Sequence, residues 1–233
     1  MILLDFRFQI SDFRFQISDF RFQISDFRFQ NLEFRFLSAS GNLKSNFCRL
    51  LRNMQIEQHV LQGICFLPSP HFNERPDEQD ISLIVLHNIS LPAGQFGLPY
   101  ISDLFLGCLD CKADPSFVDL EGLEVSAHCL VRRDGEVIQY VPFNKRAWHA
   151  GVSEYKGRQG CNDFSIGIEL EGSDHVPFTN EQYASLEELV KMLLKHYPKL
   201  NSKAITGHSD IAPGRKTDPG PHFDWARFHA SLT

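Results

Sequence analysis

The sequence lacks the features that would direct a protein to a membrane, out of the cell or onto nucleic acid. Its 233 residues hold no run of about 18 apolar residues, the length that a membrane-spanning helix needs. The N-terminus, MILLDFRF, has no basic start, no sustained apolar core and no small-residue cleavage site. Basic residues number 23 against 29 acidic ones, and the net charge of −6 disfavours nucleic-acid and anionic-membrane partners. We therefore expect a cytoplasmic protein that binds neither nucleic acid nor membrane.

Cysteine is sparse and poorly placed for a disulfide framework or a cysteine-bound metal. The chain has six cysteines, and a chain of this length without an export signal is expected to keep its thiols free. Cys108 and Cys111 form a lone C-x-x-C motif, with no second pair at zinc-finger spacing and no surrounding βαβ pattern. We expect this pair to have no catalytic or metal-binding role.

The N-terminal part differs in texture from the rest of the chain. The unit DFRFQIS occurs three times from Asp5, and a fourth copy begins after it. Its apolar residues stand two apart, which is strand alternation and not heptad spacing, and an odd repeat length moves them to the opposite face in each copy. We therefore treat residues 1–53 as a low-complexity extension that is either disordered or a start-site artefact. Our hypothesis is that the natural start is Met54 and that residues 54–233 form the functional domain.

From about Pro68 the pattern is typical of a mixed α/β domain. Apolar, β-branched runs predict buried strands at 81–90 and 164–172, and Asp134-Gly135 predicts the turn of a hairpin. Thr179 and Gln182 have the spacing of a capping box, and the helix that they begin ends before Pro198. A short strand then ends at His208, and residues 221–232 have the pattern of a terminal helix.

Residue alternation in 164–172 separates an apolar face from a polar one. Ile166, Ile168 and Leu170 share one face, and Ser165, Gly167, Glu169 and Glu171 share the other. The small side chains near Glu169 leave room above the sheet for a ligand. An unpaired buried carboxylate is costly, so Glu169 has either a salt bridge to a core arginine or work as a general base.

The stretch GHSDIAPGRKTDPG, residues 207–220, is rich in proline and glycine and predicts a loop that gathers ionisable groups. His87 and His208 both terminate predicted strands, and Asp218 follows ten residues after His208. Zinc hydrolases need three protein ligands of N, O or S type and an open position. From these residues alone, ordinary hydrogen-bonded histidines and a surface role for Lys216 remain open alternatives.

Five further segments stand out along the chain, namely VLHNIS, VSAHCLVRRDGEVIQYVP, AWHAGVS, CNDFSIGIELEG and TGHSDIAPGRKTDPGPHFDW. In this order they resemble the AmpD-type N-acetylmuramoyl-L-alanine amidases of the wider amidase and peptidoglycan-recognition fold. The resemblance runs from about Pro68 to Phe228, and residues 1–53 have no counterpart in it. It implies a mixed α/β fold, with a central mostly antiparallel or mixed β-sheet and packed helices.

The resemblance also implies roles for individual residues. His87, His208 and Asp218 match the zinc ligands, Glu169 matches the general base, and Lys216 matches the stabiliser of the developing oxyanion. Four positions are assigned to substrate binding, namely Trp148 and His149 as a wall and Asn88 and Arg215 as pocket residues. One departure is Gly160, where the family pattern leads us to expect an arginine. If that arginine holds the carboxylate of the peptide, either the affinity for the substrate is weaker here or Arg158 substitutes for it.

The implied function is zinc-dependent hydrolysis of the amide bond between the lactyl group of (1,6-anhydro)-N-acetylmuramic acid and L-alanine of the stem peptide. The partner is then an anhydromuramyl-peptide substrate from peptidoglycan recycling, and we expect a monomer. Two alternatives remain: a non-catalytic peptidoglycan-binding module, and an exported amidase that acts on intact cell wall. The presence of all three ligand positions disfavours the first, and the lack of an export signal disfavours the second.

Overall fold

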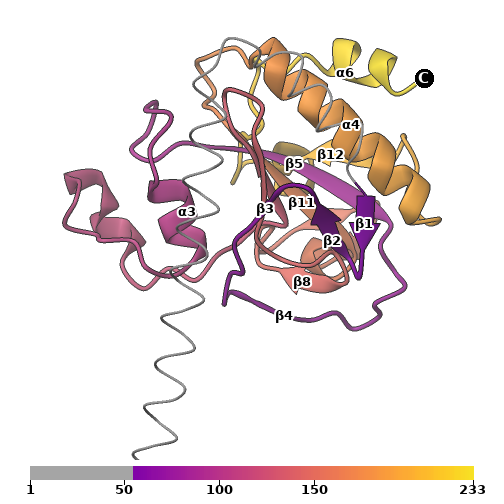
Figure 1. Ribbon diagram of the computed structural model, residues 1–233, viewed down its shortest axis with the longest axis horizontal. Coiled ribbons are helices and arrows are strands. Elements are labelled where there is room, and N and C mark those ends of the chain that lie inside the picture. Colours follow the sequence, from indigo (N-terminus) through magenta and orange to yellow (C-terminus); the bar gives the residue numbers. More distant parts are fainter. Residues whose placement is uncertain (1–54) are drawn as a thin grey trace, which may run out of the picture. The chain divides into compact units, whose positions relative to one another are not determined.

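A six-stranded β-sheet forms the centre of the computed structural model, which describes residues 55–233 (Figure 1). The strand order is β12–β5–β11–β6–β7–β3. These strands span Cys65–Phe66 (β3), Leu83–Ile89 (β5), Cys129–Val131 (β6), Val137–Gln139 (β7), Ser165–Glu171 (β11) and Ile205–Gly207 (β12). The repeat extension and the hypothetical start at Met54 lie outside the described residues.

The sheet is mixed, as expected, but its pairings are mainly parallel. The pairs β12–β5, β5–β11, β11–β6 and β7–β3 are parallel. Within this sheet the antiparallel pairing is that of β6 with β7, which flank the predicted turn at Asp134-Gly135. Of the two arrangements expected, mostly antiparallel or mixed, the mixed sheet is confirmed, because β5, β11 and β12 are reached by long crossovers that return each strand in the same direction.

Shorter elements surround the sheet. Three two-stranded antiparallel ribbons pair Gln55–Glu57 (β1) with Val60–Gln62 (β2), Phe72–Glu74 (β4) with Lys145–Ala147 (β8), and Glu154–Tyr155 (β9) with Arg158–Gln159 (β10). The helices are Tyr100–Phe105 (α3), Asn180–His196 (α4), His208–Ile211 (α5) and Trp225–Ser231 (α6), with 3-10 turns at Pro115–Leu120 (η1) and Cys161–Asp163 (η2). None of the helices in residues 55–233 has the length and apolar character to cross a bilayer.

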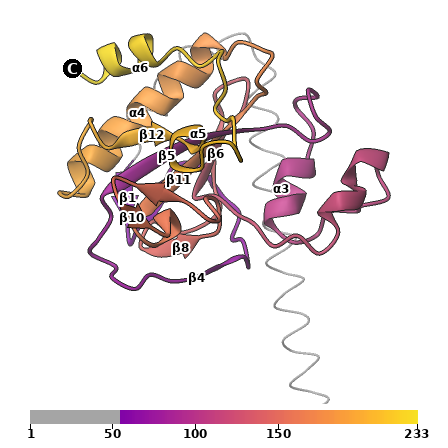
Figure 2. The ribbon, with the colours of Figure 1, turned by 180° about the vertical axis from the view of Figure 1, so that it is seen from behind.

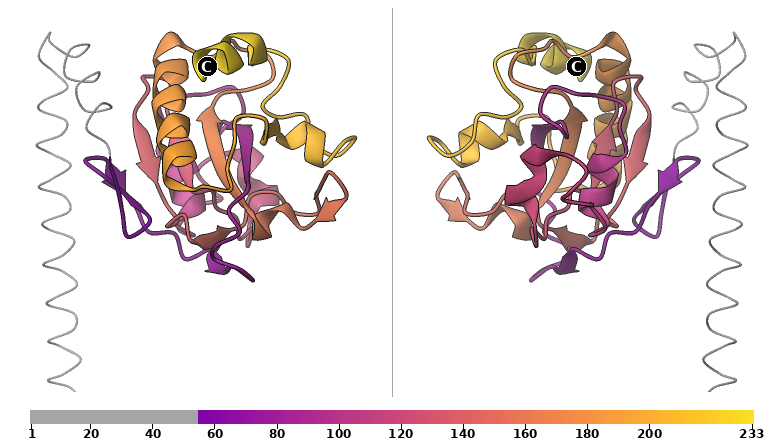
Figure 3. Two further views of the ribbon diagram at one scale, coloured as in Figure 1. Left: turned by 90° about the vertical axis from the view of Figure 1, so that its right-hand side faces the viewer. Right: turned by 90° about the vertical axis from the view of Figure 1, so that its left-hand side faces the viewer.

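The main core lies between the sheet and the helices α4 and α6, which Figures 2 and 3 show on one side of it. Ile166, Ile168 and Leu170 of β11 are at most 1% exposed and belong to this core. The apolar stripe of α4 packs in the same cluster through Leu186, Leu189, Val190 and Leu193. Full burial of each such side chain contributes about 1.5–3 kcal/mol, so this face of β11 fixes α4 against the sheet.

The helix predicted from Thr179 to before Pro198 is confirmed as α4, whereas the terminal helix predicted over 221–232 is shorter, because α6 begins only after its N-cap Asp224. The Thr179 side chain accepts a hydrogen bond from the Gln182 amide at 3.0 Å and completes the capping box of α4. Residues 207–220, predicted to be a loop throughout, begin instead with the single helical turn α5. Asp210 explains the turn, because its carboxylate accepts hydrogen bonds from the Gly207 amide at 3.0 Å and the Thr206 hydroxyl at 2.8 Å. The five cysteines of the described region are free thiols.

Candidate active site

Three side chains that could bind a metal meet where β12 and β5 lie side by side. His87 stands near the end of β5, His208 follows β12 directly, and Asp218 lies on the loop after α5. The distance between the two histidine Nδ1 atoms is 3.0 Å. Asp218 Oδ2 lies 2.9 Å from His87 Nδ1 and 3.0 Å from His208 Nδ1. The structure therefore brings together the three residues that sequence analysis selected as zinc ligands.

The donor atoms of this cluster fit a cation placed among the three of them. His208 Nε2 donates to the carbonyl oxygen of Ala150 at 3.1 Å, which leaves a lone pair on Nδ1 of the neutral ring. The Asp218 carboxylate only accepts, and burial lowers the pKa of His87 to about 4, so a second proton on that ring is disfavoured at neutral pH. Three lone-pair atoms about 3 Å apart then share at most one hydrogen. Two imidazoles and one carboxylate are a donor set that fits zinc.

Glu169 lies beside this cluster on the central strand. The parallel register of β11 and β5 pairs Glu169 with His87, so both side chains point to the same face of the sheet. Its Oε2 atom is buried and has no hydrogen-bond partner within residues 55–233. Burial, reinforced by the negative charge of Asp218 and opposed by Lys216, raises the pKa of the Glu169 carboxyl well above its ordinary value. A carboxyl whose pKa is raised in this way is suited to accept a proton and release it again during a reaction.

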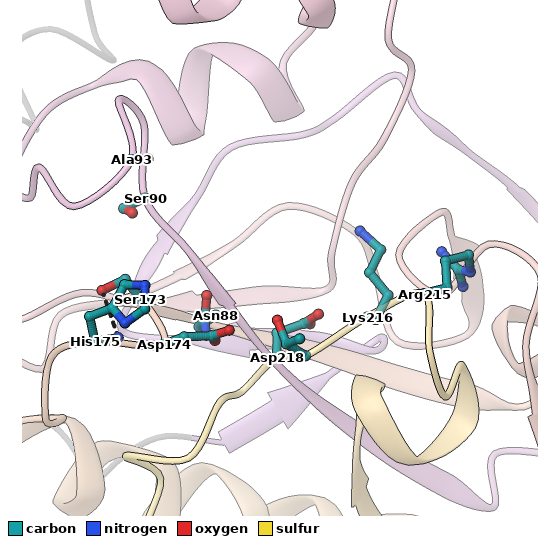
Figure 4. A pocket seen from close by; sticks show the side chains of 10 residues that line it. Asn88, Ser90, Ala93, Ser173, Asp174, His175, Arg215, Lys216 and Asp218 are labelled. Carbon is teal, nitrogen blue, oxygen red and sulfur yellow. Dashed lines mark hydrogen bonds between the residues drawn. The ribbon is translucent and has the colours of Figure 1, made fainter.

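An open cavity of about 510 Å³ adjoins the cluster at Asp218 (Figure 4). Its lining includes Asp218 and three residues predicted for catalysis or substrate binding: Lys216, Arg215 and Asn88. Asn88 Nδ2 donates to Asp174 Oδ1 at 2.8 Å, so Asp174 is a cavity residue that sequence analysis missed. Nothing in the local pattern of Asp174 marked it, since its loop approaches β5 only in the folded chain.

Arg215 has a structural task besides its place at the cavity. Its Nη2 donates to the carbonyl oxygens of Ala150 and Val152, at 2.8 and 2.6 Å. The Ala150 carbonyl is also the acceptor for His208 Nε2. Arg215 therefore fixes the acceptor that sets the orientation of a metal-binding ring.

Two residues predicted for the substrate wall do not line this cavity. The Trp148 indole N–H donates to Asn73 Oδ1 at 2.7 Å, and its ring stacks on His71. His149 lies behind His87, with its Nδ1 3.0 Å from His87 Nε2. The assignment of Trp148 to substrate binding stays a prediction. The ring nitrogens of His149 contact His87 and Ser165 in the protein interior.

Gly160, the position that departs from the family pattern, lies two residues after Arg158, its proposed replacement. Gly160 adopts the left-handed conformation, with φ of 71°, at the start of η2. Arg158, the proposed replacement, forms an ion pair with Asp80 and stacks its guanidinium over the ring of Phe164 at 3.7 Å. Arg158 thus contacts Asp80 and Phe164 in the free protein, and its substitution for the expected arginine stays a prediction.

Comparison with known proteins gives one consistent result. The family Amidase_2, described as N-acetylmuramoyl-L-alanine amidase, matches residues 77–221. The 1,6-anhydro-N-acetylmuramyl-L-alanine amidase AmpD of Escherichia coli K12 is 58% identical over 180 residues, which are 77% of this chain and 98% of that protein. AmpD of Enterobacter cloacae is 57% identical over 180 residues, with 77% and 96% covered. A crystal structure of a selenomethionine AmpD derivative superposes with a TM-score of 0.75 at 56% identity, over 77% of this chain and 100% of that one.

Proposed function

The chain belongs to the AmpD-type N-acetylmuramoyl-L-alanine amidases, and we propose that it uses zinc to hydrolyse the amide bond between the lactyl group of 1,6-anhydro-N-acetylmuramic acid and L-alanine. The substrate is a soluble cell-wall fragment, and the products are the anhydro sugar and the free peptide. This substrate class is the one named for the curated relatives, which match over nearly their whole length. A recycled fragment of this kind suits an enzyme of the cytoplasm that acts as a monomer.

One observation carries the zinc assignment: His87 Nδ1, His208 Nδ1 and Asp218 Oδ2 converge within about 3 Å with too few hydrogens to satisfy their contacts. These three atoms would hold the ion. Zinc, when bound, polarises the scissile carbonyl and lowers the pKa of water toward neutrality, to about 7 in known hydrolases. The two neutral imidazoles and one carboxylate contribute a single negative charge, which leaves a stronger Lewis acid than thiolate ligands would.

The protein's own groups supply the proton transfers. Glu169, with its raised pKa and its unpartnered Oε2, accepts a proton from the attacking water and delivers it to the leaving amine of L-alanine. Lys216 lines the cavity on the same loop as Asp218 and supplies a positive charge for the developing oxyanion (Figure 4). Asn88 and Arg215 border the space where the sugar and peptide would lie.

The test is peptide release from anhydromuramyl-tripeptide by the purified full-length chain, followed by mass spectrometry with and without a chelator. The expected result is release that the chelator abolishes and added zinc restores. Release that persists after complete metal removal would reject the zinc assignment. Folded, zinc-loaded protein that binds the fragment without cutting it would reject catalysis and favour a binding module.

A second substrate in the same assay separates recycling from wall remodelling. Polymeric peptidoglycan at equal bond concentration should be cut far more slowly than the soluble fragment. Equal rates on both substrates would favour an amidase that acts on intact wall.

A further inference from the structure

His149 lies between the central strand and the metal-binding His87, and both of its ring nitrogens are occupied inside the protein. Its Nδ1 lies 3.0 Å from His87 Nε2, and its Nε2 lies 3.1 Å from Ser165 Oγ. The rings of His149 and His87 meet edge to face at an interplanar angle of 82°. His149 therefore contacts the back of His87, on the side opposite to His208 and Asp218.

Gly167 makes room for the His149 ring. A Cβ atom placed on Gly167 would stand 2.4 Å from His149 Cγ and 2.5 Å from its Nδ1. The backbone of Gly167 is not in a left-handed conformation, so space and not torsional freedom explains the glycine. Ser165 stands two residues earlier on the same face of β11 and meets the far end of the ring. The polar face of β11 is therefore shaped to seat this imidazole.

The hydrogen positions in this chain of contacts follow from the acceptors at its end. Ser165 Oγ lies 2.6 Å from the carbonyl oxygen of Cys161, which can only accept. The Ser165 hydroxyl therefore donates its hydrogen to the Cys161 carbonyl, and Ser165 Oγ accepts a hydrogen bond from His149 Nε2–H. A neutral imidazole carries one N–H, so His149 Nδ1 has a lone pair and accepts from His87 Nε2–H.

The final member of the chain is the metal ligand itself. His87, with its hydrogen on Nε2, presents the lone pair of Nδ1 to His208 and Asp218. The opposite tautomer would place a hydrogen on Nδ1, where it would bond to Asp218 and occupy the position of the metal. Partners behind a metal-binding histidine commonly fix its tautomer and raise its affinity for the ion.

We propose that His149, held by Ser165 over Gly167, is a positioning residue that keeps His87 in the tautomer whose Nδ1 binds zinc. The proposal rests on the proposed function as a zinc amidase. It replaces the expected substrate-wall role of His149. A wall residue would change KM for the substrate, whereas a positioning residue changes the affinity of the protein for zinc.

The experiment compares zinc affinity, by competition with a chelating dye, in full-length wild type, Ser165→Ala, His149→Phe and Ser185→Ala. Ser185 on α4 is the matched control. Like Ser165 it is a buried serine whose hydroxyl donates to a backbone carbonyl, here that of Gly135 at 2.7 Å. Ser165→Ala and His149→Phe should bind zinc about 10–100-fold more weakly, and Ser185→Ala should match wild type. Unchanged affinity in both site variants, with a raised KM in His149→Phe, would restore the substrate-wall role.

Long-range ¹H–¹⁵N spectra of the histidine rings give a second readout that does not depend on turnover. In metal-free wild type at about pH 8, His87 and His149 should both carry their hydrogen on Nε2, and Ser165→Ala should mix the tautomers. A hydrogen on Nδ1 of either ring in wild type would overturn the proposal. Wild type that shows both Nε2–H tautomers but binds no zinc would refute the proposed function, while the contacts from Ser165 through His149 to His87 would stand. Failure of the proposal and failure of the proposed function are therefore distinguishable.

Discussion

The two faces of the seven-residue strand β11 serve opposite purposes. On one face, Ile166, Ile168 and Leu170 are enclosed by α4 and add only apolar contacts. On the other face, Ser165 and Gly167 seat His149, and Glu169 keeps a buried carboxylate oxygen without a partner. Buried, unpaired polar atoms destabilise a fold, and apolar burial stabilises it. The strand shows how stability gained on one face permits a costly chemical group on the other.

The largest expected effect comes from removing the carboxylate of Asp218, which lies on the side of the sheet that the polar face of β11 lines. Asp218→Ala should abolish zinc binding and activity together, since it deletes one of three ligands and the only anion among them. Metal analysis and peptide release on the same sample measure both losses. Asp119→Ala, an exposed carboxylate on η1, is the control and should retain both. Asp218→Ala that still binds zinc at wild-type affinity would contradict the ligand assignment.

Glu169→Gln should separate metal binding from turnover. The amide keeps the size of the side chain but cannot take a proton, so kcat should fall by about 10²–10⁴-fold while zinc content stays at the wild-type level. Glu171→Gln is the matched variant, because Glu171 lies on the same face of β11 and accepts hydrogen bonds from the Gly97 and Arg133 amides at 2.6 and 3.0 Å. It should keep its turnover. A fully active Glu169→Gln enzyme would remove the assigned base.

On the apolar face, Ile168→Ala should cost stability and leave the chemistry intact. The side chain is fully buried in the core between β11 and α4, and truncations of this kind cost about 2–5 kcal/mol in the free energy of unfolding. Urea denaturation measures the loss, and peptide release per folded molecule should equal that of wild type. A loss of kcat as large as that of Glu169→Gln, in protein that is still folded, would show that the two faces are not independent.

Periodicity was sufficient to predict both faces of β11, the capped helix α4 and the hairpin at Asp134-Gly135, because these features are local. The metal cluster needed the resemblance to a family, since His87 and Asp218 are 131 residues apart and only the sheet order brings them together. The parallel pairing of β5 with β11 and β12 has no local signal. The seat of His149 was missed for the same reason, because Gly167 and Ser165 are explained only by a ring from a distant loop.

The pH dependence of stability sharpens the contrast between the two glutamates. The folded state raises the pKa of Glu169 above its ordinary value of 4.5, so the unfolded chain releases this proton first as pH rises. The stability that the protonated form adds is complete below about pH 4.5 and is lost as pH rises through the folded-state value. In metal-free protein, the stability of Glu169→Gln relative to wild type should therefore increase as pH rises from about 4.5 to the folded-state pKa of Glu169. Glu171→Gln should instead be less stable than wild type, because it weakens two charge-assisted hydrogen bonds.

The smallest expected effect comes from weakening α4, which covers the apolar face of β11. It tests whether a less stable α4 leaves the zinc affinity of the opposite face unchanged. Thr179 Oγ1 accepts from the Gln182 amide at 3.0 Å and donates to the Arg133 carbonyl at 2.7 Å, at the start of α4. Thr179→Ala should cost about 1 kcal/mol and lower Tm by roughly 2–4 °C, with Thr233→Ala, an exposed threonine, as the control. Zinc affinity should be unchanged, because α4 contacts the face of β11 opposite to the metal ligands. A change in zinc affinity upon loss of this cap would mean that strain in α4 passes through β11, and the separation of the two faces would then fail.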